Sequence, residues 1–309
     1  MHDVRDIVVL ARDAAMSTTY KPALLRAIVR LQRDAGRLEL GLVEVAEQFA
    51  HLYWTQTVVF HLRQAASLSK EPEVLQALRT SAAQTNSHKF SELPTVARER
   101  LILSIARTLR IDVLRRFHVG LPSGALPIYT WDGGDTIIFT PASVDFVRAN
   151  AMALDIIANH WWARFLEKVN LMAPAIIQKI EADGVRRGSL RWFFERVAQT
   201  DNSRCFYCNA DLSNTTAVRH IDHVLPWSFL LADPAWDLVL ACGRCNLGKS
   251  DRLPNRRFIN LLETINRQRV ARMPEFMRGS PPLPTGGISQ LYDAARAVEW
   301  PNAWEPALL

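Results

Sequence analysis

The sequence contains no long apolar run. No stretch approaches the roughly 20 consecutive apolar residues that a membrane-spanning helix needs. The first residues also do not combine a short basic segment with the continuous apolar core of a secretion signal. These absences exclude apolar transmembrane helices and predict a cytoplasmic protein with no membrane partner.

Cysteine is scarce, with 4 in 309 residues, and all of it falls in one region as two C-x2-C pairs. The pairs are Cys205 with Cys208, and Cys242 with Cys245. This pattern excludes the disulfide framework of small secreted proteins and indicates metal ligands. Four thiolates complete the tetrahedral shell of structural Zn2+ and leave no position for an activated water. An iron-sulfur cluster usually has other spacings, so we predict zinc.

Charge of neither sign dominates, although the formal net charge of +6 suits a polyanionic partner without identifying it. The 49% hydrophobic content is ample for a core, and the length favours two domains or one elaborated domain.

Helical periodicity fills most of the first two-thirds of the chain. Amphipathic or apolar patterns predict helices over 19–36, from 42, over 97–109, over 142–169 and from 174 to 180 or beyond. Two β-rich runs around a D-G-G turn predict a small hairpin within 126–140. The fold class is therefore mainly α with a small β-hairpin, plus a small α+β zinc module near the C-terminus.

Three regions follow from these patterns. We expect a mostly helical recognition or regulatory region over 1–199, the cysteine module over 200–260, and a C-terminal helix and tail over 261–309. Trp300, Pro301 and Trp304 in the tail are expected to pack back onto the body of the protein.

Polar residues crowd between the two cysteine pairs. In RHIDHVLPWS, His220, Asp222 and His223 lie within four positions of a short β-like run. In WDLVLACGRCNLGKS, residues 238–240 form a second predicted strand and Asn246 opens a helix. The predicted order is strand, strand, helix.

The combination C-x2-C, D-H with a following proline, and C-x2-C-N-x2-K resembles the four-cysteine variants of the HNH (ββα-metal) endonuclease superfamily. The resemblance covers roughly residues 204–257. It implies a ββα module that hydrolyses nucleic-acid phosphodiester bonds with Mg2+ or a similar divalent ion such as Mn2+.

The residues themselves agree with that chemistry. Asp222 and Asn246 offer the oxygen ligands that a hard catalytic cation prefers. His223 suits a general base, because an imidazole takes up a proton near neutral pH. His220 would point to the same strand face as Asp222 and could contact the metal or a phosphate.

Asp237 departs from the pattern, because HNH nucleases usually have an asparagine here that orients the general base. A carboxylate could accept a hydrogen bond from the histidine ring and would make the ring more basic, but it cannot supply the donor of an amide. Activity is therefore expected, with Asp237 as a catalytic-site residue.

The substrate is expected to be DNA, in double-stranded form. Phosphate contacts are predicted for a basic group that lines or follows the last helix of the module, namely Lys249, Arg252, Arg256 and Arg257. The segment TTYKPALLRAI and the later Tyr53 and Trp54 resemble stretches ahead of HNH modules in bacterial restriction and antiviral-defence proteins. This resemblance implies companion defence proteins. Two alternatives remain open: a non-catalytic zinc module that binds nucleic acid, and an RNA-cleaving nuclease.

Overall fold

The computed structural model describes residues 1–67, 69, 71–171, 173–181, 188–213, 219–297, 300 and 303–307. The chain forms two compact units, one of Met1–Val169 with Ile176–Ala182 and one of Asn170–Ala175 with Asp183–Leu309. Within the described ranges, no helix is long and apolar enough to cross a bilayer.

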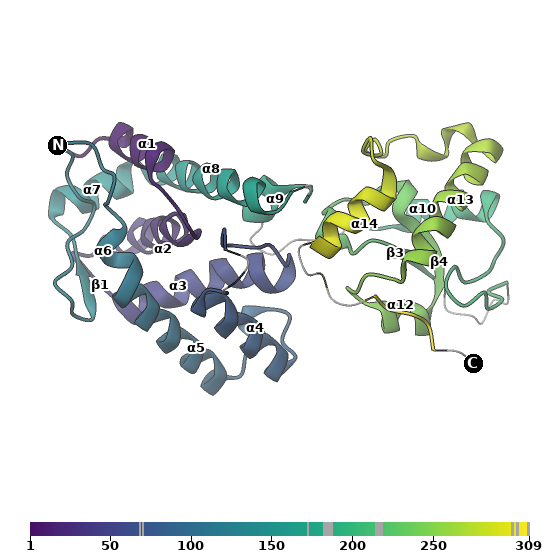
Figure 1. Cartoon of the computed structure of the whole chain (residues 1–309), viewed down its shortest axis with the longest axis horizontal. Helices are drawn as coiled ribbons and strands as arrows, with labels where there is room; N and C mark the ends of the chain where they lie inside the picture. Colours follow the sequence, from purple (N-terminus) through teal and green to yellow (C-terminus); the bar gives the residue numbers. More distant parts are fainter. Residues whose placement is uncertain are drawn as a thin grey trace. The chain divides into compact units, whose positions relative to one another are not determined.

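The first unit is almost wholly helical (Figure 1). Its elements are α1 (Val4–Asp13), α2 (Tyr20–Ala35), β1 (Glu39–Gly41), α3 (Leu42–Trp54), a π-helical turn (Thr55–Val59), α4 (Glu73–Thr85), a 3-10 turn (Phe90–Glu92), α5 (Thr95–Thr108), a second π-helical turn (Leu109–Val113), α6 (Leu114–Arg116), β2 (Thr136–Ile138), α7 (Pro141–Ala149), α8 (Ala151–Val169) and α9 (Ile176–Glu181).

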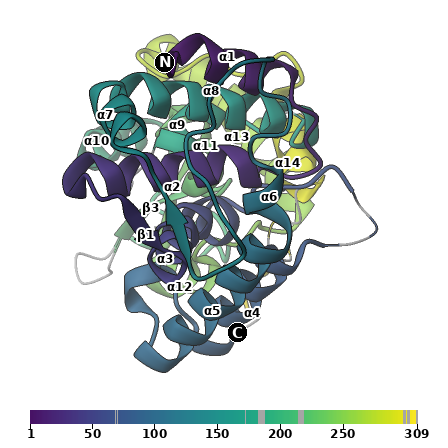
Figure 2. The same cartoon turned by 90° about the vertical axis from the view of Figure 1, so that its left-hand side faces the viewer.

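Helix α2 lies at the centre of this unit, between α8 and α3 (Figure 2). It ends where Gly36 adopts a left-handed conformation (φ 58°) and donates its N–H to the Gln32 carbonyl, a conformation that glycine adopts at little cost. The TTYKPALLRAI segment starts this helix, and its Thr19 and Arg26 side chains have partners inside the core. Thr19 Oγ1 lies 2.5 Å from Tyr53 Oη, and the Arg26 guanidinium pairs with Asp155 at 2.9 Å. The segment therefore packs as core.

The predicted hairpin within 126–140 is present only as a single bridge, in which Thr130 and Ile138 exchange two backbone hydrogen bonds. The main partner of β2 is β1, and Leu40 lies opposite Ile137 in an antiparallel register. The helix predicted over 142–169 is divided at Asn150 into α7 and α8.

The second unit contains the predicted ββα arrangement. Its elements are α10 (Arg191–Thr200), β3 (Arg219–His223), α11 (Trp227–Leu230), a 3-10 turn (Ala235–Asp237), β4 (Leu238–Cys242), α12 (Gly243–Lys249), α13 (Arg256–Arg272), a further 3-10 turn (Pro274–Met277) and α14 (Gly287–Ala297). Strands β3 and β4 are antiparallel and pair His223 with Leu238 and Arg219 with Cys242.

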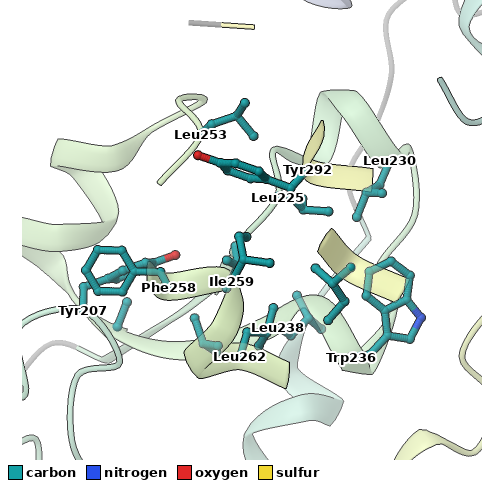
Figure 3. Packing of buried hydrophobic residues seen from close by; sticks show 14 of the residues in the cluster. Tyr207, Leu225, Leu230, Trp236, Leu238, Leu253, Phe258, Ile259, Leu262 and Tyr292 are labelled. Carbon is teal, nitrogen blue, oxygen red and sulfur yellow. The ribbon is translucent and has the colours of Figure 1, made fainter. Parts of the chain in front are cut away.

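One apolar core holds the elements of this unit together (Figure 3). Ile259 and Leu262 on α13 pack with Leu238 at the start of β4 and with Tyr292 on α14. Phe193 on α10 belongs to the same core. Helix α10 therefore belongs to the second unit.

Candidate functional site

The four cysteines converge on one point. Their sulfur atoms all lie within 4.8 Å of one another, and Cys208 Sγ lies 3.8 Å from Cys242 Sγ. Cys205 and Cys208 belong to a tight turn in which the Asn209 N–H donates to the Cys205 carbonyl at 2.8 Å. Cys242 ends β4 and caps α12 by accepting a hydrogen bond from the Cys245 N–H.

This arrangement fits zinc. A tetrahedral shell with Zn–S bonds of about 2.3 Å places its sulfurs about 3.8 Å apart, which matches the separation of Cys208 and Cys242. All four positions of that shell are taken by thiolates, so the chemistry of this donor set is structural. The cluster ties the turn around Cys205 to the end of the β-hairpin, and the Phe206 N–H also donates to the Leu240 carbonyl at 2.8 Å.

Asp222 lies on β3 and is buried. Two side chains from other elements contact its carboxylate. Tyr207 Oη donates to Asp222 Oδ2 at 2.6 Å, and Lys249 Nζ lies 3.3 Å from the same oxygen. Burial and the nearby Asp222 raise the pKa of Tyr207 well above its ordinary value, so the phenol keeps its proton. The turn that contains Cys205 and Cys208 thus fixes the orientation of Asp222 through Tyr207.

Lys249 corrects one expectation. It was predicted to contact phosphate, but its side chain is only 1% exposed and forms the ion pair with Asp222. A buried cation in an ion pair is not available to a nucleic-acid backbone. Its sequence position, at the end of C-x2-C-N-x2-K, did not indicate burial.

Asn246 lies on α12 three residues before Lys249 and is half-buried. Residues three apart lie on one face of a helix, and Lys249 reaches Asp222 from that face. Within the described part of the chain, no hydrogen bond engages the Asn246 side chain. A carboxylate from β3 and an amide oxygen from α12 fit a hard divalent cation such as Mg2+.

His223 is 7% exposed at the side chain, and its Nε2 lies 2.9 Å from Asp233 Oδ1. Asp233 was not singled out from the sequence. It reaches the ring because α11 ends at Leu231 in a left-handed conformation (φ 52°), which turns the chain back. The expected partner of this ring was Asp237, and the structure gives it Asp233.

His220 packs against the start of α12. A Cβ built on Gly243 would lie 3.4 Å from His220 Nε2, so the ring covers this glycine closely. Its backbone pairs with Ala241, and strand alternation puts its side chain on the same face as that of Asp222. The described contacts of His220 include no group of the proposed metal site.

Asp237 is fully buried, and its Oδ1 accepts a hydrogen bond from the Leu225 N–H at 2.9 Å. Oδ2 has no partner among the described residues. Burial raises the pKa of this carboxyl well above its ordinary value. A protonated carboxyl has one acceptor and one donor, as an amide does. In its protonated form, Asp237 would therefore offer the donor that a carboxylate lacks.

We expect Asp237→Asn to raise the thermal stability of the protein. The wild-type carboxyl stays protonated in the folded state but ionises on unfolding above about pH 4, so wild-type stability falls as pH rises toward the folded-state pKa. Asparagine removes this loss, and the gain in Tm should grow between pH 5 and 8 to about 2–6 °C. Thermal unfolding at several pH values measures it.

Asp211 provides the matched control for this experiment. A backbone hydrogen bond from Ser213 lowers the pKa of this exposed carboxyl, so Asp211→Asn should not raise Tm at neutral pH. A gain for Asp237→Asn that is equal at every pH would show that the carboxyl is not protonated in the folded protein.

The three arginines predicted to contact phosphate have protein partners. Arg252 donates to the Gly248 carbonyl, Arg256 pairs with Asp293, and Arg257 lies 3.5 Å from Glu305. All three are exposed and keep unused N–H donors. Their observed contacts stabilise the junction of α12, α13, α14 and the tail.

The C-terminal tail contacts the elements of the site through Trp304. Trp304 exchanges backbone hydrogen bonds with Leu253 and Asn255, and its ring lies 5.2 Å from that of Tyr207. A Cβ on Gly248 would lie 3.5 Å from Trp304 Nε1. Pro301 lies outside the described residues. The tail thus packs against Tyr207 and against α12. Tyr207, and Lys249 at the end of α12, are the residues that contact Asp222.

Comparison with known families agrees with this geometry. The model of the HNH endonuclease family matches residues 205–255, about a sixth of the chain. No curated protein and no solved structure matches the chain. The matched segment contains the four cysteines together with Asp222, His223 and Asn246.

Proposed function

We propose that the HNH module at residues 205–255 makes this protein a divalent-metal-dependent endonuclease. The family match supports nuclease function in general. The observation that carries the specific proposal is the contact of the buried His223 ring with the half-buried Asp233 carboxylate. His223 directly follows Asp222, the proposed cation ligand. A base oriented by a carboxylate and adjacent to a cation ligand is the arrangement that phosphodiester hydrolysis requires.

The hydrogen bond to Asp233 defines the role of each His223 nitrogen. A carboxylate can only accept, so the neutral ring carries its proton on Nε2 and donates it to Asp233. The lone pair on Nδ1 then remains free to take a proton from the attacking water. In this way Asp233 sets both the tautomer and the orientation of the base.

A divalent cation held by Asp222 and Asn246 would stabilise negative charge that develops on the scissile phosphate and the leaving oxygen. Tyr207 and Lys249 hold the Asp222 carboxylate in place by contacts at 2.6 and 3.3 Å. Lys249 also compensates the charge of this carboxylate inside the protein, where an isolated charge would be costly.

Replacing Asp233 should show whether it orients the His223 ring or contributes to substrate affinity. We expect Asp233→Ala to lower the single-turnover cleavage rate by about 10²-fold with little change in substrate affinity, because the ring loses its tautomer and orientation. Asp233→Asn should retain more activity, since its amide oxygen still accepts from Nε2–H. Rates at saturating substrate and dissociation constants measure the two effects.

The control for Asp233 is Asp293→Ala, which removes an exposed carboxylate of the same unit that pairs with Arg256. It should change the rate less than 2-fold. Equal losses for both variants would mean that Asp233 has no special relation to the base.

We propose DNA as the substrate and restriction of invading DNA as the biological role. We also propose that the protein acts with companion defence proteins. Purified protein should be incubated with supercoiled plasmid, linear DNA and RNA, each with magnesium, with manganese and with no added cation. Metal-dependent cleavage of DNA supports the proposal. Cleavage of RNA alone would favour the RNA-cleaving alternative, and binding without cleavage would favour the non-catalytic zinc module.

A further inference from the structure

A pocket of about 270 Å³ lies in the second unit between the segment that enters the zinc-bound turn and the outer face of α13. Asn202, Arg204 and Phe206 line one wall, and Leu261, Ile265 and Arg272 line the other. Since Phe206 directly precedes Tyr207, which holds Asp222, the pocket and the active site share the zinc-bound turn.

The pocket has an excess of positive charge. Its one lining carboxylate, Asp201, is paired with Arg269, whose Nε lies 2.9 Å away. Arg204 and Arg272 are exposed, and their observed partners are the carbonyls of Asn209 and Thr200. A guanidinium has five N–H donors, so both keep several for an anion.

Apolar side chains also line the pocket. Leu261 is 40% exposed on α13, and Ile265 follows one turn later on the same face. Phe206 is half-buried on the opposite wall. Exposed apolar surface next to two guanidinium groups matches a ligand that has a flat apolar face and a phosphate, which is the chemistry of a nucleotide.

The size of the pocket restricts its occupant. The pocket is small, at about 270 Å³, and a base within a duplex is stacked on both faces and is not accessible to a pocket of this kind. We propose that this pocket binds one unstacked nucleotide of the substrate, in a single-stranded or locally opened segment. The inference rests on the proposed nuclease function and specifies the form of nucleic acid that the protein holds.

Direct binding tests this proposal without cleavage. Fluorescein-labelled dT12, U12 and a blunt 12-base-pair duplex are titrated with the His223→Ala protein, and anisotropy gives the dissociation constants. Leu261→Glu, which places a carboxylate in the pocket, should weaken binding of dT12 or U12 at least 10-fold. Its matched control is Val270→Glu on the same helix, 39% exposed and outside the pocket lining, which should cost less than 3-fold.

A second pair of variants tests the phosphate contact. Arg272→Gln should weaken single-strand binding and make its salt dependence shallower by about 0.7 in log–log slope, whereas Arg267→Gln, exposed on α13 outside the pocket, should do neither. Duplex binding should change less than 3-fold in every variant. Equal losses for pocket and control variants, or equal losses for duplex and single strand, would overturn the proposal.

Failure of this proposal can be distinguished from failure of the nuclease function. Binding is measured on a protein without its general base, while cleavage is measured on the protein with His223 intact. Thermal unfolding and zinc content of each variant establish that it is folded.

Discussion

His223→Ala is expected to lower the rate of nucleic-acid cleavage by about 10²–10⁴-fold, the usual contribution of a general base. No other described side chain replaces it, because the neighbouring His220 packs on Gly243 and has no contact with Asp233. Zinc content and substrate affinity should not change, since His223 contributes to neither. Single-turnover cleavage of plasmid at saturating enzyme measures the loss.

The control for His223 is His160→Ala, which removes an exposed ring on α8 of the first unit. It should leave the rate within 2-fold of the wild type, and the loss in a His223→Ala protein purified in parallel excludes a contaminating nuclease. In a host challenged with phage, His223→Ala should lose protection if restriction is the role. A folded His223→Ala protein that cleaves at the wild-type rate would refute the proposed base.

Loss of the zinc site is expected to abolish cleavage by a different route. Structural zinc contributes about 10–16 kcal/mol in zinc-finger peptides, which is comparable to the whole stability of a typical domain. Cys245→Ala should therefore release zinc and unfold at least the turn around Cys205. Tyr207 lies in that turn and holds Asp222 at 2.6 Å, so the active site should lose its geometry as well.

Zinc analysis, limited proteolysis and cleavage assays on one preparation measure these effects. The turn and the end of the hairpin should become sensitive to protease, whereas the helices of the first unit should stay resistant, because they have their own core. Removing zinc with a chelator and adding it back should restore cleavage. A Cys245→Ala protein with full zinc content and full activity would contradict this interpretation.

The zinc site and the ββα order could be predicted because spacing encodes them. Two C-x2-C pairs indicate a set of metal ligands regardless of the surrounding sequence. The short apolar run at 238–240, between a turn and a cysteine pair, indicates a β-strand. Long amphipathic helices such as α2 were predictable for the same reason, since one repeated pattern covers several turns.

Contacts made by tertiary packing could not be predicted from the same sequence. Asp233 gives no local signal, because its approach to His223 depends on the turn at Leu231. The burial of Lys249 depends on how α12 packs on β3. The pairing of β1 with β2 joins three-residue strands far apart in sequence, where no periodicity is long enough to indicate it.

Asp237 illustrates how burial changes the meaning of a residue type. From the sequence, a carboxylate in place of an asparagine indicates a lost donor. In the structure, complete burial raises the pKa of this carboxyl, which favours the protonated form, and that form has both a donor and an acceptor as an amide does.

The central claim is that one module contains two metal sites with separate tasks, a zinc that shapes it and a divalent cation that acts in catalysis. Zinc content and cleavage rate should be measured together on one preparation while magnesium is titrated from zero. The account predicts one zinc per chain at every point and a rate that rises from near zero to saturation with magnesium. Full cleavage without magnesium, at a rate that follows the zinc content, would contradict it.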